Sequence, residues 1–293
     1  MSNFLSIFIF CINIMIGIIG LGFVGGSMLK SFTKKMVDVV GYDKYKDGGI
    51  GKFENTLEAS IVFLCLPTLF DEETKEYNKK AIHAVCEQLV ENNYEGLVVL
   101  KSTIEPETTT ILSKKYPQLQ ICHNPEFLTA RTAYEDFHNQ THIVLGKGVN
   151  CTEENMKLLK DFYTTYYPNA EISECSSLES ESMKIMCNSF YASKIMLFNE
   201  YYLLCKKNGS DFNKIKSLML KNKWINPMHT CVPGPDGKLG YGGACFPKDT
   251  QALNYYMKNK NTKNKVLDSV CQEKNEVRDT HLDNKCVQKL CFK

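Results

Sequence analysis

Short β-branched and aliphatic runs alternate with longer polar or amphipathic stretches, and this alternation restricts the fold more than any other feature of the sequence. The apolar runs lie at residues 14–19, 37–42, 61–66, 97–100, 119–122 and 142–145. Such a pattern indicates successive strand and helix units, which form a parallel sheet covered by helices on both faces. We therefore predict an α/β fold for the first part of the chain, with the pattern ending near residue 172.

A long helical signal follows from Ser176. A capping-box pattern of Ser176 and Glu179 opens it, and Asn208 with Gly209 ends it. Its apolar face is wide enough to pack within a domain or against a second copy of the chain. That face comprises Met183, Met186, Cys187, Phe190, Leu197, Phe198 and Tyr201.

The remainder of the chain predicts further helices around an irregular loop. A second helix begins at Ser210 or Asp211, a loop rich in glycine and proline follows, and later helices start near Thr250 and Val266. We divide the chain into an extension, an α/β domain, a helical central domain that contains the loop, and a short tail. These segments comprise residues 1–13, 14–172, 173–280 and 281–293.

The composition excludes some classes of partner and site. Thirty-five Lys and Arg residues against 33 Asp and Glu give a net charge of +2, which supplies no field for nucleic acid or a membrane surface. The 13 cysteines include no CxxC pair, so we predict free thiols in a reducing compartment and a cytoplasmic protein. The six histidines include no HExxH pair, and we predict no metal site.

The stretch from Phe4 to Val24 contains no charged residue, so its length and polarity are compatible with a membrane span or a signal peptide. It lacks a basic segment at its start, however, and its second half carries glycines in a spacing that a nucleotide-binding turn explains. We therefore interpret this half as a buried first strand and predict no membrane partner.

Gly20, Gly22 and Gly25 form a GxGxxG pattern between this strand and a helix-compatible segment. In dinucleotide-binding folds the first glycine permits a tight turn, the second lets a pyrophosphate approach, and the third lets helix and strand pack closely. Asp43 ends the next apolar run, where an acid accepts hydrogen bonds from the adenosine ribose and repels a 2′-phosphate. The pattern predicts a Rossmann-type domain that binds NAD rather than NADP.

Cys245 lies in a glycine-rich loop just before a predicted helix and close to Lys248. Positive potential from the helix start and from the lysine favours the thiolate form, so we predict that Cys245 is a nucleophile. On the long helix, Lys184 and Asn188 lie one turn apart on one face, where they can point together at a substrate oxygen.

Several motifs follow one another in an order that resembles the UDP-glucose/GDP-mannose dehydrogenase family, especially its UDP-glucose 6-dehydrogenases. They are GLGFVG (20–25), LPT (66–68), KSTIEPETT (101–109), NPEFL (124–128), ESMKIMCNSF (181–190) with FNE (198–200), and GYGGACFPKDT (240–250). The resemblance implies an NAD-dependent, four-electron oxidation of a sugar-nucleotide C6 alcohol to a carboxylate in two hydride transfers.

The resemblance also implies roles for individual residues. Cys245 captures the aldehyde as a thiohemiacetal, whose oxidation gives a thioester that water hydrolyses. Lys184 and Asn188 match residues that stabilise the developing oxyanion. The matches to residues for acid/base work and for positioning the water are Glu126, Thr103 and Asp249.

Binding contacts are assigned in the same way. Cofactor contacts fall on Gly20, Gly22, Phe23, Val24, Gly25, Asp43, Pro67, Thr68, Ser102, Thr103 and Lys248. Substrate contacts fall on Phe127, Leu128, Lys184, Asn188, Gly242 and Gly243. A homodimer formed through the central helical region is also expected.

The chain departs from the family pattern mainly in length, because family members usually continue into a UDP-binding domain that this sequence does not contain. Three interpretations follow, in order of preference: a compact active dehydrogenase, a catalytic fragment completed by a partner chain with that domain, and an NAD-binding protein without turnover. Hydroxyacid and 6-phosphogluconate dehydrogenases share the N-terminal fingerprint and form a further alternative. Motif wording alone favours UDP-glucose over GDP-mannose and UDP-N-acetylmannosamine.

Overall fold

The computed structural model describes residues 14–278, which divide into two units. The first unit comprises residues 14–66, 82–102 and 109–177, and the second comprises residues 67–81, 103–108 and 178–278. The extension predicted at 1–13 and the tail predicted at 281–293 lie outside the described residues.

A seven-stranded sheet forms the centre of the first unit, in the order β2-β1-β3-β6-β7-β8-β9. Its strands are β1 (Ile16–Ile19), β2 (Val39–Tyr42), β3 (Ile61–Leu64), β6 (Leu97–Leu100), β7 (Gln120–His123), β8 (His142–Lys147) and β9 (Glu171–Ser176). Five neighbouring strands of this sheet, β2, β1, β3, β6 and β7, run parallel, so their carboxyl ends meet at one edge. In open α/β sheets this is the edge at which ligands bind.

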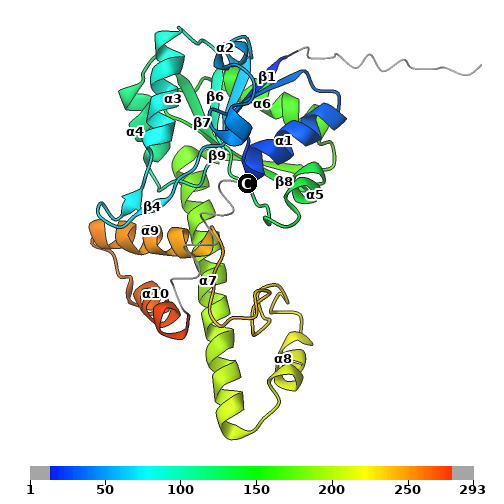
Figure 1. Ribbon diagram of the computed structural model, residues 1–293, viewed down its shortest axis with the longest axis vertical. Coiled ribbons are helices and arrows are strands. Elements are labelled where there is room, and N and C mark those ends of the chain that lie inside the picture. Colours follow the sequence, from blue (N-terminus) through cyan, green and yellow to red (C-terminus); the bar gives the residue numbers. More distant parts are fainter. Residues whose placement is uncertain (1–13, 279–293) are drawn as a thin grey trace, which may run out of the picture. The chain divides into compact units, whose positions relative to one another are not determined.

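Helices cover both faces of this sheet (Figure 1). α1 (Phe23–Lys34), α5 (Ala133–His138) and α6 (Glu153–Tyr166) lie on one face, and α3 (Lys80–Glu91) and α4 (Thr108–Lys115) lie on the other. The short helix α2 (Phe53–Thr56) and the 3-10 turn η1 (Lys46–Gly48) follow β2.

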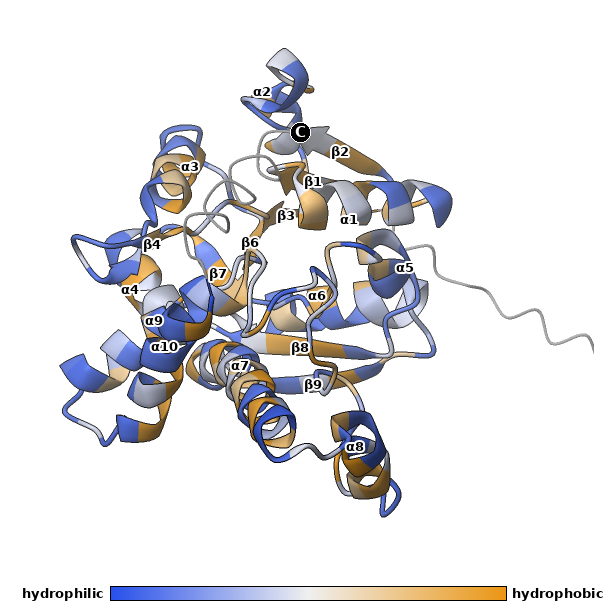
Figure 2. Ribbon diagram, turned by 60° about the horizontal axis from the view of Figure 1, so that its bottom comes forward, coloured by the Kyte–Doolittle hydropathy of each residue, from blue (hydrophilic) through white to orange (hydrophobic). Residues whose placement is uncertain are grey.

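The core of the first unit lies between the sheet and α1, α5 and α6. Phe32 of α1 and Phe162 of α6 meet edge to face with ring centroids 5.3 Å apart. β3 and β6 are buried along their whole length because helices cover both of their faces. Figure 2 accordingly shows these strands as mainly hydrophobic. The α/β prediction is confirmed.

Two sequence predictions for the sheet need correction. The sheet is not wholly parallel, since β8 runs antiparallel to β7 and pairs Lys147 with Cys122. Strand direction leaves no trace in an apolar run, so the sequence pattern gave no sign of the reversal. The alternation also continues beyond residue 172, because β9 pairs in parallel with β8. This strand is only partly buried and therefore lacks an apolar run.

The second unit combines a small hairpin with helices. The hairpin pairs β4 (Phe70–Asp71) with β5 (Glu76–Tyr77), and the helices are α7 (Ser177–Asn208), α8 (Phe212–Leu220), α9 (Phe246–Asn259) and α10 (Lys265–Val277). Gly209 ends α7 with a φ of +76°, a conformation that glycine adopts without strain. Asp211 caps α8 by accepting hydrogen bonds from two backbone amides, at one of the two positions where the sequence predicted the start of this helix.

Helix α9 begins at Phe246, earlier than the predicted start near Thr250. Pro247 lies in its first turn, where a missing N–H has no helical partner to lose. The sequence prediction treated this proline as part of the loop. The correction matters because Cys245 becomes the N-cap residue of α9.

Three apolar clusters hold the second unit together. The hairpin joins α7, α9 and α10 through Tyr77, Ile185, Ala252, Leu253 and Leu267. Two further clusters attach α8 and the glycine-rich loop to α7, and their buried members are Phe198, Cys205, Phe212 and Val232, then Ala192, Met196 and Tyr241. Across residues 14–278, no helix combines the length and the apolar character that a membrane crossing requires.

Candidate functional site

The glycine turn of the first unit follows β1 directly. Gly20 has a φ of +91°, and a Cβ atom there would lie 2.5 Å from the carbonyl oxygen of Cys65. A Cβ atom on Gly25 would lie 1.9 Å from the carbonyl oxygen of Gly20. A Cβ atom on Gly22 would meet no atom within 4 Å. Packing thus requires glycine at positions 20 and 25. Gly22 faces open space instead, as a phosphate-binding turn needs.

Asp43 follows β2 and lies against this turn. Its Oδ2 accepts a hydrogen bond from the amide of Leu21 at 2.7 Å, and its Oδ1 accepts from the amides of Tyr45 and Lys46, each at 2.9 Å. Partial burial raises the pKa of Asp43, but these three amides and the charge of Lys46 outweigh it and leave the pKa below its ordinary value. A carboxylate offers about four acceptor sites, so the ionised Asp43 keeps capacity for a ribose hydroxyl.

Lys46 is a further residue of this turn, and the sequence analysis did not select it. Its Nζ donates to the carbonyl oxygen of Leu21 at 2.7 Å, within the glycine motif. Phe23 and Val24 are the first two residues of α1. The side chain of Phe23 is exposed, and that of Val24 packs against the core. The turn, Asp43 and the start of α1 form a site suited to a dinucleotide.

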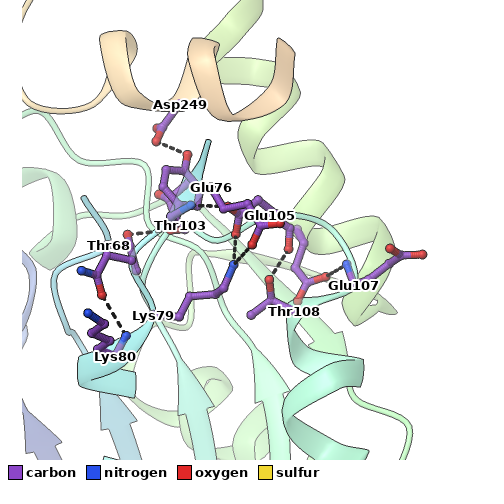
Figure 3. Close-up of polar contacts among 12 residues, drawn as sticks. Thr68, Glu76, Lys79, Lys80, Thr103, Glu105, Glu107, Thr108 and Asp249 are labelled. Carbon is purple, nitrogen blue, oxygen red and sulfur yellow. Dashed lines mark hydrogen bonds and ion pairs between the residues drawn. The ribbon is translucent and has the colours of Figure 1, made fainter. Parts of the chain in front are cut away.

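Ser102 ties together the ends of two neighbouring strands in the first unit. Its hydroxyl donates to the carbonyl oxygen of Leu66 at 2.6 Å and accepts from the amide of the same residue at 3.0 Å. In the second unit, Thr68 donates to the carbonyl oxygen of Thr103 at 2.7 Å (Figure 3). Pro67, between these pairs, is exposed.

A buried lysine holds the NPEF segment (residues 124–127) of the first unit in place. Lys101 donates to the Oδ1 atom of Asn124 at 2.9 Å and to the carbonyl oxygen of Pro125 at 3.3 Å. The Glu126 carboxylate accepts from the amide of Leu128 at 2.6 Å. The ring of Phe127 stacks on that of His142, with centroids 6.1 Å apart.

The cysteine site of the second unit is built around the first turn of α9. Cys245 is exposed and carries no disulfide. Its carbonyl oxygen accepts the amide of Asp249 at 3.0 Å, so the two side chains lie one turn apart on the helix. Asp249 is wholly buried, and its Oδ2 accepts from Asn188 Nδ2 at 2.6 Å. Lys184, one turn before Asn188 on α7, is also buried.

Lys248 lies at the same place, and its ammonium group contacts Asp249 Oδ1 at 2.6 Å. The sequence analysis assigned this lysine to the cofactor and to the thiol of Cys245. In the structure its nearest charged partner is the aspartate. The hydroxyl of Tyr77, on the hairpin, donates to the same Oδ1 atom.

Tyr77 and Arg278 are two residues of this site that the sequence analysis missed. Tyr77 stands in no motif, and a short polar hairpin gives no signal of a buried phenol. Arg278 ends α10 and donates to the carbonyl oxygen of Leu239 at 3.0 Å, in the loop that leads to Gly242 and Gly243. A lone arginine near the end of a helix is an ordinary surface residue in sequence, so only the fold could identify it.

Comparisons with known proteins match both parts of the chain. The model of the UDP-glucose/GDP-mannose dehydrogenase family NAD binding domain matches residues 50–167, and the model of that family's central domain matches residues 178–276. NAD is therefore the cofactor of the first matched domain.

Curated relatives include UDP-glucose 6-dehydrogenases. The enzyme of Rickettsia bellii is 34% identical over 189 residues, which cover 63% of this chain and 42% of the relative. That of Rickettsia felis is 30% identical over 239 residues, which cover 80% of this chain and 51% of the relative. The chain thus spans about half the length of the curated relatives it matches.

Solved structures confirm the fold. A UDP-glucose dehydrogenase of Pyrobaculum islandicum superposes with a TM-score of 0.78 at 24% identity, covering 90% of this chain and 68% of that one. A 3-hydroxyisobutyrate dehydrogenase of Mycobacterium tuberculosis reaches a TM-score of 0.70 at 17% identity, covering 92% and 95%. Two dehydrogenase classes share the fold, and the two family matches distinguish them. The chain belongs to the UDP-glucose/GDP-mannose dehydrogenase family, of which it carries NAD-binding and central domains.

Proposed function

We propose that the chain is an NAD-dependent nucleotide-sugar dehydrogenase that oxidises the C6 alcohol of UDP-glucose to the carboxylate of UDP-glucuronate. The observation that carries this proposal is the cysteine site. An exposed thiol stands at the N-terminus of α9, and a buried carboxylate with amide and ammonium partners lies one turn later. Retained family motifs and UDP-glucose 6-dehydrogenase relatives support the choice of substrate.

The first unit supplies the cofactor site in this proposal. Gly22 leaves room for the pyrophosphate, and Asp43 accepts hydrogen bonds from the adenosine ribose. When bound there, NAD would supply the hydride acceptor for each of the two successive oxidations. In the same proposal Phe23, Val24, Pro67, Thr68, Ser102 and Thr103 complete the cofactor contacts.

Cys245 divides the oxidation into separate steps. After the alcohol has lost a hydride and its hydroxyl proton, the sulfur of Cys245 bonds to the aldehyde carbon and the thiol proton passes to the aldehyde oxygen. The resulting thiohemiacetal loses a second hydride and its hydroxyl proton to give a thioester. Water then attacks the carbonyl carbon, the C–S bond breaks, and the thiol is restored as the carboxylate forms.

The surrounding residues serve charge and proton transfer. Lys184 and Asn188 donate hydrogen bonds to the oxygen on which negative charge develops, a role that requires fixed donors. Their burial on one face of α7 supports this role. Asp249, Glu126 and Thr103 position the attacking water and move protons. Phe127, Leu128, Gly242 and Gly243 contact the sugar nucleotide in the same proposal.

A homodimer through α7 is part of the proposal. Phe190, Leu197 and Leu204 are spaced by seven residues along this helix, and their side chains are 64%, 45% and 60% exposed. A heptad spacing of apolar side chains favours packing against a second helix of the same kind. The working enzyme would then be this chain alone, or this chain with a partner that supplies a UDP-binding domain. We place it in a reducing, cytoplasmic compartment, where the thiol of Cys245 remains free.

The test is the number of NADH molecules formed per sugar nucleotide consumed. Purified protein is given UDP-glucose, GDP-mannose or UDP-N-acetylmannosamine with NAD. Two NADH per UDP-glucose, with UDP-glucuronate as product, is the expected result. One NADH per substrate would assign a single-hydride dehydrogenase, and NAD binding without NADH would assign a protein without turnover.

Cys245→Ser is the informative variant, and Cys231→Ser is its matched control because Cys231 is also an exposed cysteine of the second unit. We expect Cys245→Ser to abolish formation of the acid and to leave NAD affinity within about twofold of the wild type. Cys231→Ser should retain both. Equal losses in the two variants would show that the thiol of Cys245 has no special role.

A further inference from the structure

Tyr77 is a buried residue whose hydroxyl has a specific polar partner. The side chain is 2% exposed and packs against Ile185, Ala252 and Leu253. A phenylalanine ring would fill nearly the same volume. The hydroxyl therefore adds nothing to apolar packing, and its presence is explained by its hydrogen bond to Asp249 Oδ1.

Asp249 receives donors on both carboxylate oxygens. Tyr77 Oη and Lys248 Nζ donate to Oδ1, and Asn188 Nδ2 donates to Oδ2. Lys248 Nζ also stands 4.5 Å above the centroid of the Tyr77 ring. All three groups are donors, so both oxygens of the Asp249 carboxyl group act as acceptors here.

The phenol acts only as a donor in this arrangement. Burial, followed by the negative charge of Asp249, raises the pKa of Tyr77 well above its usual range. Its O–H therefore stays protonated over the pH range in which an enzyme works. The backbone of Tyr77 is fixed as well, since its amide donates to Glu105. Glu105 in turn pairs with Lys79 at 3.0 Å (Figure 3).

We propose that Tyr77 is a positioning residue for the oxidation: its hydroxyl holds Asp249 so that Asn188 keeps the donor end of its amide at the reacting oxygen. The inference rests on the proposed function. The amide nitrogen of Asn188 carries two N–H groups, and Asp249 takes one of them. The second N–H is then directed by the same geometry. The β4–β5 hairpin becomes part of the catalytic structure through this contact.

Loss of the Tyr77 hydroxyl removes one hydrogen-bond donor from Asp249. The groups that face the pair are Lys248 and Cys245 from the start of α9, Asn188 from α7, and Glu105 from the segment at residues 103–108. Without Tyr77 Oη, Oδ1 keeps one donor in place of two. The carboxylate is then held by fewer contacts, and Asn188 loses part of the support that directs its amide at the reacting oxygen.

Tyr77→Phe tests the proposal because it deletes one oxygen atom and keeps the ring. Tyr94→Phe is the matched control: Tyr94 is also a buried tyrosine, and its hydroxyl donates to the carbonyl oxygen of Ala59 at 2.9 Å in the first unit. We expect Tyr77→Phe to lower kcat about tenfold and to leave the KM for NAD unchanged. Tyr94→Phe should change neither. A kcat that Tyr77→Phe leaves unchanged, or a kcat that falls only together with a rise in the KM for NAD, would overturn the proposal.

A second measurement needs no turnover and separates this inference from the proposed function. Labelling of Cys245 by iodoacetamide is followed against pH on the peptide that contains it, by mass spectrometry. A less compensated carboxylate one turn away disfavours the thiolate, so the midpoint of labelling should rise in Tyr77→Phe and stay constant in Tyr94→Phe. Absence of NADH in the wild type would refute the proposed function. An unchanged labelling midpoint would refute the role of Tyr77 whether or not the protein turns over.

Discussion

A Cβ atom on Gly242 would lie 2.1 Å from the Nη2 atom of Arg278, so glycine at this position leaves the space that the guanidinium occupies. Arg278 is buried, donates to the carbonyl oxygens of Leu239 and Gly240 at 3.0 and 3.3 Å, and forms an ion pair with Asp236. The end of α10 is thereby tied to the loop that leads to Cys245. Gly242 has a structural reason to be glycine, separate from any substrate contact.

Gly242→Ala should destabilise the second unit through this contact alone. The added methyl group must displace Arg278, and we expect a loss of about 1–3 kcal/mol in the free energy of unfolding, as for other overpacked positions. In an Arg278→Ala background the methyl group finds space, so the further loss should be small. Urea unfolding of the wild type, both single variants and the double variant measures the coupling.

The control for this cycle is Gly242→Ala combined with Tyr94→Phe, a change in the first unit. The two effects should add, because the residues share no partner. Additive losses in the Gly242→Ala, Arg278→Ala cycle would instead show that the arginine is not the reason for the glycine.

The fold of the first unit was largely predictable because each part of the argument is local. Buried parallel strands read as continuous apolar runs, and a glycine with positive φ marks the turn after the first of them. The direction of β8 was not predictable, since the same residues pair equally well in either direction. β9 escaped detection because none of its six residues is fully buried.

The two glycines of the dinucleotide turn should respond differently to alanine. Gly25→Ala places Cβ 1.9 Å from the carbonyl oxygen of Gly20 and should destabilise the fold. Gly22→Ala meets no atom within 4 Å, so stability should remain within about 1 kcal/mol of the wild type. Its methyl group would instead occupy the approach of the pyrophosphate, and we expect NAD affinity to fall at least about tenfold.

Thermal unfolding and calorimetric NAD titration of the two variants distinguish these effects. A Gly22→Ala protein that binds NAD as tightly as the wild type would place the cofactor elsewhere. Unchanged unfolding of Gly25→Ala would contradict the close approach of helix and strand.

The candidate site was predictable only in part, for a physical reason. Cys245, Asp249 and Lys248 lie in one helical turn and its cap, so a motif records them together. Tyr77 reaches Asp249 from 172 residues away in the chain, on a hairpin whose sequence is merely polar. Contacts of this kind depend on tertiary packing, and a single sequence contains no pattern from which to infer them.

The exposed heptad of α7 predicts that a charge at its centre prevents association. Leu197→Glu places a carboxylate between Phe190 and Leu204, where a second helix would have to bury it. Light scattering should report a dimer for the wild type and a monomer for the variant. Met36→Glu, at an 89% exposed methionine of the first unit, should leave the dimer intact. A wild-type monomer would remove the proposed interface.

Glu273 on α10 predicts how stability varies with pH. Partial burial, with the carboxylates of Glu200 and Glu276, raises its pKa to about 7. The folded protein therefore binds this proton more tightly than the unfolded chain, in which the pKa of a glutamate is about 4.5. Stability from this group is present below about pH 4.5 and is lost as the pH rises to about 7.

Glu273→Gln removes the charge that causes the loss, so its melting temperature should exceed that of the wild type at pH 8 by about 1–3 °C and match it at pH 4. Glu153→Gln changes an exposed glutamate of the first unit and should show no such gain at pH 8. If the gain from Glu273→Gln were equal at both pH values, the repulsion between the glutamates of α7 and α10 would not be its source, because protonation at pH 4 already removes that repulsion.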